Sequence, residues 1–341
     1  MSLTSNFVPP SAVSRAAVHQ APVSANFEGV TDVHICAARL SDSYLAPGPR
    51  KIDAVELASV TALAHACQEK TSDAPHISEF MVKFNGVSWR VQTDKAAVDG
   101  VWFRCRRAPD RTIYFEDMGC KLPPAIVRVL LHPALNQGGI VLVTGAPGVG
   151  KTTTASAIVT TRLREHGGIA YTIEDPPEHL LNGWHGKGRC SQTHVAADGW
   201  AASLRRALRS QPAGMPSIMF VGELRDADAA AVALTSAASG FLVIATAFGT
   251  DIANGVETFT RHAASGSPER AASVAALLRV VVHQSMPMPR VIQARILVNP
   301  VASCLVAARI RDCAFQTLDD LANWQSNLVR ADQDLWRECA A

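Results

Sequence analysis

The segment 145–153 has the residue types and the spacing of a phosphate-binding loop. It follows an apolar run, 139–144, that is short enough for a buried parallel strand, and it leads into residues typical of the first turns of a helix. In that setting glycines let backbone N–H groups surround a phosphate, and the helix N-terminus adds partial positive charge. The segment predicts a nucleoside triphosphate site made of Gly145, Ala146, Pro147, Gly148, Val149, Gly150, Lys151, Thr152 and Thr153.

Two side chains of this loop have specific expected tasks. Lys151 is expected to reach the β- and γ-phosphate oxygens, and the hydroxyl of Thr152 is expected to bind Mg²⁺. A turn between a strand and a helix could match the pattern by chance. We set that alternative aside because the sequence pattern and the flanking elements agree.

Three carboxylates, those of Glu174, Asp175 and Glu178, come directly after the strand candidate 169–173. Ligands of open α/β sheets bind at the carboxyl ends of the strands, so these groups are expected to face the same crevice as the loop. They could hold Mg²⁺ through water, position a nucleophile or pair with an arginine. A solvated acidic turn is the alternative.

A second strand candidate, 217–221, is followed by Gly222 and Glu223. An apolar strand that ends in a carboxylate has the form of a Walker B element, and a carboxylate there can accept a proton from an attacking water. We therefore predict that Glu223 is the general base. Asp226, three residues later, fits a helix cap equally well.

Arginines form two further groups. Arg205, Arg206 and Arg209 have helical spacing, which indicates a solvated basic face or a contact with a carboxylate of the site. The second group is distant from the loop in sequence and could supply charge across a subunit interface, as arginine fingers do. Its members are Arg104, Arg106 and Arg111.

Repeated strand–helix units around the loop predict a mostly parallel sheet covered by helices, hence an α/β fold. Before it, Asn85-Gly86 between alternating residues predicts a hairpin within an α+β region. Helices are expected at 269–282 and 318–336, with one late strand at 291–298. We expect four parts: a flexible tail 1–28, an N-terminal α+β domain 29–120, an ATPase core 121–254 and a mostly helical part 255–341.

Composition excludes several classes. The net charge of +2 and the lack of a basic, aromatic-interleaved stretch argue against direct nucleic-acid binding. Eight cysteines without a Cys-x-x-Cys pair argue against a zinc site and a disulfide framework, and suit a reducing cytosol. No apolar run reaches the length of a membrane span, and the N-terminus lacks the apolar region of a secretory signal. A transit peptide would carry more arginine than the single Arg15.

In order along the chain, several stretches resemble the secretion or traffic ATPases: PilT-like pilus motors, GspE-like type II secretion ATPases, and VirB11-like and DotB-like type IV secretion ATPases. The similarity covers roughly residues 29 to 310. The acidic segment 172–178 is similar to the family's Asp box, and 220–226 together with 233–243 is its most specific part. The absence of a four-cysteine metal element favours the PilT/DotB side.

The resemblance implies a small, PAS-like N-terminal domain followed by a RecA-like P-loop domain. It implies a homo-hexamer with ATP and Mg²⁺ at the subunit interfaces, in which hydrolysis works an inner-membrane platform protein from the cytoplasmic side. Lys151 and Thr152 then bind phosphate and Mg²⁺, Glu223 is the base, Glu174, Asp175 and Glu178 form the Asp box, and Arg104 and Arg111 act in trans.

One departure from the family concerns Phe248, which stands where the family's His box usually has histidine. This replacement removes a polar contact to the γ-phosphate. Two rivals to a motor of a pilus, secretion or conjugation apparatus stay open, and the Phe248 replacement motivates only the second of them. One is a RecA-type nucleic-acid motor, and the other is an assembly component that binds ATP but hydrolyses it slowly.

Overall fold

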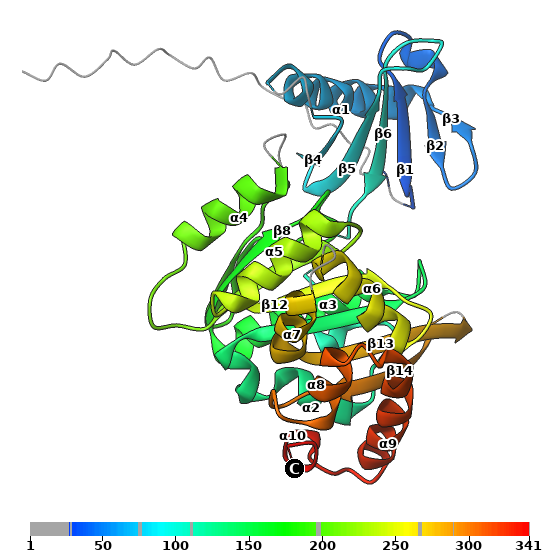
Figure 1. Cartoon of the computed structure of the whole chain (residues 1–341). Coiled ribbons are helices and arrows are strands. Elements are labelled where there is room, and N and C mark those ends of the chain that lie inside the picture. Colours follow the sequence, from blue (N-terminus) through cyan, green and yellow to red (C-terminus); the bar gives the residue numbers. More distant parts are fainter. Residues whose placement is uncertain are drawn as a thin grey trace, which may run out of the picture.

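A computed structural model describes residues 27, 29–73, 77–109, 112–195, 199–264, 268–288 and 290–340. The expected tail, 1–28, lies outside these residues except for Phe27, and so does Arg111. Two sheets organise the described chain, one in each half of the sequence (Figure 1).

The first sheet is antiparallel and has the strand order β3-β2-β1-β6-β5-β4. Helix α1 (Ala54–Asp73) packs on it through Val60, Leu63 and Cys67, and the indole of Trp89 is buried in the same core. Asn85-Gly86 forms the predicted hairpin turn. The strands are β1 (Asp32–Cys36), β2 (Tyr44–Ala46), β3 (Arg50–Lys51), β4 (Glu79–Phe84), β5 (Val87–Asp94) and β6 (Trp102–Arg107).

The second sheet has the order β14-β13-β7-β12-β11-β8-β10-β9. Its strands run parallel from β13 to β10, and antiparallel strands border both edges. The expected parallel α/β sheet is thereby confirmed. The strands are β7 (Gly139–Gly145), β8 (Gly168–Ile173), β9 (Gly183–His185), β10 (Gly188–Ser191), β11 (Ser217–Glu223), β12 (Leu242–Phe248), β13 (Leu278–Met288) and β14 (Val291–Val298).

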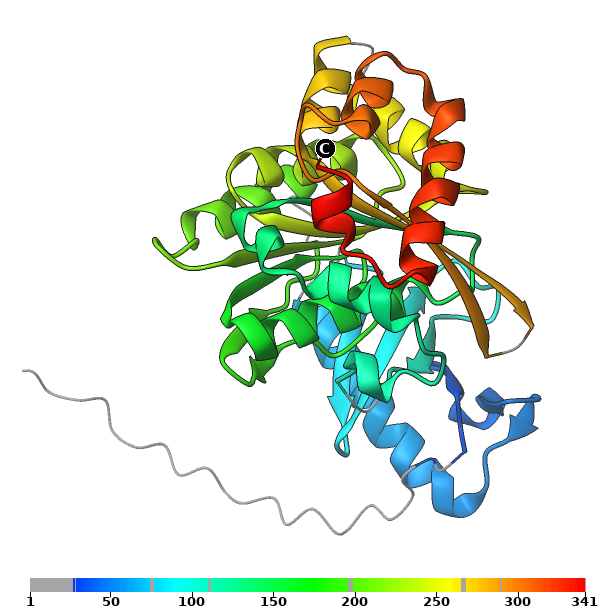
Figure 2. The ribbon, with the colours of Figure 1, turned by 90° about the horizontal axis from the view of Figure 1, so that it is seen from below.

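Helices cover both faces of this sheet because successive strand residues point to opposite sides. Ile140 and Leu142 of β7 pack with α5–α9 on one face, whereas Val141 and Val143 pack with α2, α3 and α10 on the other (Figures 1 and 2). The helices are α2 (Pro124–Leu131), α3 (Lys151–His166), α4 (Gly199–Arg209), α5 (Ala227–Ala238), α6 (Ile252–Ala264), α7 (Pro268–Leu277), α8 (Leu305–Arg311), α9 (Leu318–Arg330) and α10 (Leu335–Glu338).

The prediction of a helix over 269–282 is wrong for residues 278–282. Helix α7 ends at Leu277, and residues 278–282 begin β13, which pairs with β7 on one side and β14 on the other. This strand is covered on both faces, so Val280, Val281 and Val282 are all buried and show no alternation. The expected helix 318–336 is divided into α9 and α10. Within the described residues, no helix is both long and apolar enough to cross a membrane.

Candidate nucleotide-binding site

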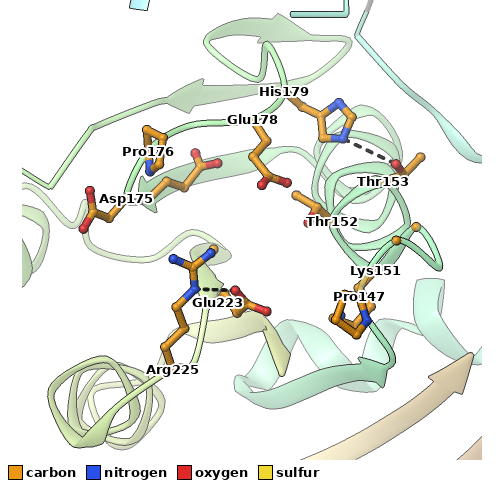
Figure 3. A pocket seen from close by; sticks show the side chains of 14 residues that line it. Pro147, Lys151, Thr152, Thr153, Asp175, Pro176, Glu178, His179, Glu223 and Arg225 are labelled. Carbon is orange, nitrogen blue, oxygen red and sulfur yellow. Dashed lines mark hydrogen bonds and ion pairs between the residues drawn. The ribbon is translucent and has the colours of Figure 1, made fainter. Parts of the chain in front are cut away.

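Three segments of the second sheet meet at one edge: the loop after β7, the acidic segment after β8 and the end of β11, with β12 lying between β7 and β11. They enclose a cavity of about 370 Å³ (Figure 3). The strands are parallel, so their carboxyl ends bring together side chains that are far apart in sequence. The cavity is lined by Pro147, Gly148, Gly150, Lys151, Thr152, Thr153, Glu174, Asp175, Pro176, Glu178, His179, Gly222, Glu223 and Arg225.

The loop has the backbone form that phosphate binding requires. Gly150 precedes α3 with a φ of 87°, a left-handed conformation that side chains other than glycine rarely adopt, and α3 begins at Lys151. Lys151 is 7% exposed, and its Nζ donates a hydrogen bond to the carbonyl oxygen of Ala146 at 3.0 Å. Burial lowers the pKa of Lys151, while the carboxylates of Glu223 and Glu178 oppose that effect. The ammonium group therefore lies at the head of a helix and faces two acids.

The three predicted carboxylates all line the cavity, but their environments differ. Glu174 is 2% exposed, and its Oε1 accepts a hydrogen bond from Nε2 of Gln192 at 2.9 Å. Burial raises the pKa of Glu174 to about 7. Asp175 is exposed and lies 3.3 Å from Nε2 of His194.

Glu178 connects the cavity with the first sheet. Its side chain points toward Thr152 in Figure 3. Its Oε1 also lies 3.7 Å from Nη1 of Arg90, which belongs to β5. An arginine of the N-terminal half thus contacts the rim of the cavity within one chain.

Glu223 is held by a residue for which the sequence suggested no role. Nε of Arg225 donates a hydrogen bond to Oε2 of Glu223 at 2.5 Å (Figure 3). This bond raises the pKa of Arg225, with further contributions from Glu178 and Asp175. Asp226 caps α5 by accepting a hydrogen bond from the backbone N–H of Ala229 at 2.9 Å, which is the structural role weighed for it.

His179 is a second lining residue that sequence reasoning missed, because we grouped it with ordinary surface or core histidines. Its Nε2 lies 3.4 Å from Oγ1 of Thr153, so it joins the acidic segment to the first turn of α3 (Figure 3). Burial lowers the pKa of His179. Its position next to Glu178 was the available signal.

Of the other predicted arginines, those within the described residues do not line this cavity. Nη2 of Arg104 donates to Oδ2 of Asp94 at 2.9 Å, and Nε of Arg106 donates to Oδ1 of Asp32 at 2.7 Å. The three predicted arginines of α4, Arg205, Arg206 and Arg209, are all exposed, and none of them lines the cavity. Phe248 ends β12 beside Gly145 and is 48% exposed.

Residues 75–296, well over half of the chain, match the family described as "Type II/IV secretion system protein". The chain belongs to this family. The resemblance inferred from the loop, the acidic segment and the Glu223 region is thereby confirmed.

One curated relative is the type IV pilus retractation ATPase PilT of Pseudomonas aeruginosa, which is 34% identical over 156 residues, or 45% of this chain and 41% of that one. The uncharacterized protein YggR of Escherichia coli (strain K12) is 32% identical over 197 residues, which is 56% of each chain. The chain spans 56% and 41% of the length of YggR and PilT, and less of several other curated relatives, such as 24% of a type II secretion system protein E of Klebsiella pneumoniae.

Two solved structures share the fold of this secretion-family chain. A crystal structure of the pilus retraction motor PilT with bound ADP has a TM-score of 0.64 and 23% identity, and the match covers 86% of this chain and 85% of that one. The ATPase DotB of Legionella pneumophila has a TM-score of 0.63 and 21% identity, with 88% and 84% covered. The chain thus has the fold of the PilT and DotB ATPases.

Proposed function

We propose that this chain binds ATP with Mg²⁺ in the cavity after β7, β8 and β11 and hydrolyses it. One observation carries the proposal. A glycine-rich loop with a buried lysine, a helix N-terminus and the carboxylate of Glu223 at the end of the parallel strand β11 all border one cavity of about 370 Å³. The ADP bound to PilT, a protein of the same fold, supports the same ligand class.

The residues of the cavity suit a metal that arrives with its nucleotide. Mg²⁺ usually keeps several waters and takes one or two protein oxygens together with substrate phosphates. The hydroxyl of Thr152, with Glu178 pointing toward it, offers such a set (Figure 3). When bound, Mg²⁺ would neutralise phosphate charge during the displacement.

Four side chains of the site would then have these tasks. Lys151 and the backbone N–H groups of the loop bind and orient the β- and γ-phosphates. Glu223 accepts the proton of the attacking water, and Arg225 orients the Glu223 carboxylate and adds positive charge beside the phosphates. Glu174 is buried, and the hydrogen bond that it accepts from Gln192 stabilises the acidic segment.

At the level of the assembly, we propose a homo-hexameric ring that powers a type IV pilus, a type II or IV secretion system or a conjugation apparatus. It would be a cytoplasmic protein at the periphery of the bacterial inner membrane, working on a platform protein there. Arg104 and Arg111 of a neighbouring subunit are the proposed trans arginines. The fold and the family support this proposal.

The test compares ATP turnover and nucleotide affinity in three proteins: wild type, Glu223→Gln and Lys151→Ala. We expect Glu223→Gln to lower kcat by about 10²-fold or more while it still binds ATP, because general-base catalysis contributes about 10²–10⁴-fold. Lys151→Ala should instead bind ATP more weakly, because it lacks the ammonium group that contacts the phosphates. Unchanged turnover in Glu223→Gln would refute the base assignment, and a wild type that binds no nucleotide would refute the whole proposal.

A further inference from the structure

Strand β13 continues alongside the phosphate-binding loop after its partner β7 has ended. Its last pairing with β7 joins His283 to Thr144, and the next residue, Gln284, lies beside Gly145. A Cβ on Gly145 would lie 2.3 Å from the carbonyl oxygen of Gln284, so only glycine lets the two backbones approach this closely. The first residue of the loop therefore rests directly against β13.

The side chain of Gln284 reaches the other end of the same loop. It is fully buried, and its Nε2 donates a hydrogen bond of 2.6 Å to the carbonyl oxygen of Val149. Its Oε1 is also buried and has no hydrogen-bond partner among the described residues. One glutamine thus contacts the loop at Gly145 through its backbone and at Val149 through its side chain.

This contact bears on phosphate binding because of how such a loop works. Its N–H groups must converge on the phosphate, so carbonyl groups of the same peptides are directed away from it, toward the protein. A buried carbonyl without a donor is unfavourable, and the loop could relieve that by turning the peptide. The amide of Gln284 supplies the donor that the Val149 carbonyl needs in the binding conformation.

We propose that Gln284 is a positioning residue that holds the phosphate-binding loop in its nucleotide-accepting shape and couples the loop to the β13–β14 hairpin. The proposal rests on the proposed function of the site. Gln284 pairs with Ala294 of β14, and the hairpin extends beyond the loop to the pair Met288 and Val291. Figures 1 and 2 show this hairpin projecting from the body of the second sheet. Because coupling is reciprocal, nucleotide that stabilises the loop also stabilises the hairpin.

The test uses the full chain and a fluorescent ADP analogue with Mg²⁺. Gln284→Met keeps the length of the side chain and removes the donor, and we expect about tenfold weaker binding. Gln325→Met is the matched control. Gln325 is also buried, and it exchanges two hydrogen bonds with the backbone of Val298 on β14, at 2.6 and 3.0 Å. We expect the control to lower the melting temperature as much as Gln284→Met does, but to bind the analogue within twofold of wild type.

Hydrogen exchange of the wild type tests the coupling even if the Gln284→Met variant fails to fold. With ADP and Mg²⁺ bound, amides of the hairpin around residues 284–294 should exchange at least threefold more slowly. In Gln284→Met at saturating ADP this protection should disappear.

Two results would overturn the role of Gln284. One is wild-type affinity in Gln284→Met, and the other is hairpin exchange in the wild type that does not respond to ADP. If the wild type itself fails to bind the analogue, the proposed function falls and the role of Gln284 falls with it. Binding by the wild type with no effect of Gln284→Met counts against the positioning role alone.

Discussion

Nε of Arg225 donates a hydrogen bond to Oε2 of Glu223 at 2.5 Å, so the carboxylate that we assign as general base is bound to a guanidinium group two residues along the chain. The pair lies at the cavity wall that faces Lys151 (Figure 3). A base must be oriented toward its proton before its basicity matters. The hydrogen bond fixes that orientation.

We expect Arg225→Met to lower kcat for ATP hydrolysis about tenfold, which corresponds to about 1.4 kcal/mol of barrier. The Glu223 carboxylate would lose its only charged partner among the ion pairs of the described residues and rotate more freely. Steady-state phosphate release measures kcat. Arg225→Lys keeps the charge but lacks the planar guanidinium, so its kcat should lie between those of the wild type and Arg225→Met. Faster turnover in Arg225→Met would instead mean that Arg225 restrains the base.

Phe248 gives the second prediction. The pairing of β12 with β7 places Phe248 beside Gly145, the first residue of the phosphate-binding loop, and Phe248 is half exposed. A phenyl group donates no hydrogen bond to phosphate, whereas hydrogen bonds to charged groups contribute about 1.5–3 kcal/mol. We therefore expect Phe248→His to raise kcat by about tenfold.

Phe248→Ala is the matched control for this substitution, because it removes the ring without adding a donor. Turnover should rise in the histidine variant and not in the alanine variant. An equal rise in both would show that the bulk of Phe248, and not the missing hydrogen bond, limits the rate.

The strongest sequence predictions concern features that local backbone chemistry determines. The loop 145–153 and the hairpin turn at Asn85-Gly86 require particular residues at particular backbone angles, so the sequence shows both. Short apolar runs and strand–helix spacing predicted most of the second sheet, since strands of a parallel sheet covered on both faces are apolar throughout.

Features that depend on tertiary context were not predictable in the same way. Residues 278–282 were expected to continue a helix because a strand buried on both faces has no alternation to distinguish it. His179 acquires its partner Thr153, and Arg225 acquires its place in the cavity wall, only when β7, β8 and β11 end at one edge. No spacing along the chain encodes that convergence. The special form of the N-terminal domain, expected to be PAS-like, stays a prediction.

His179 supplies the third prediction, on nucleotide affinity. Its Nε2 lies 3.4 Å from Oγ1 of Thr153, the residue after the proposed Mg²⁺ ligand. His179→Phe fills similar space without the nitrogen, and we expect Kd for ADP with Mg²⁺ to rise about three- to tenfold, or about 0.7–1.4 kcal/mol, the size of one hydrogen bond. Titration calorimetry measures this affinity. The amide of His179→Gln can replace Nε2 and should recover most of it. Equal losses in the two variants would assign His179 a packing role.

The last prediction concerns the pH dependence of stability, and it follows from the burial of Glu174. Burial raises the pKa of Glu174 from 4.5 to about 7, so the folded chain binds this proton more tightly than the unfolded chain does. The stabilisation is therefore complete below about pH 4.5 and is lost as the pH rises through about 7. A difference of about 2.5 pKa units corresponds to about 3 kcal/mol at most. Glu174→Gln keeps the neutral shape and cannot ionise, so its free energy of unfolding should match the wild type near pH 4 and exceed it by up to about 3 kcal/mol at pH 8. Urea unfolding at both pH values measures this difference. Glu69→Gln, a change at an exposed carboxylate on α1, is the control and should show no such divergence.

A constant difference between Glu174→Gln and wild type across this range would show that Glu174 is ionised in the folded chain, held by Gln192 and its other hydrogen-bond partners despite its burial.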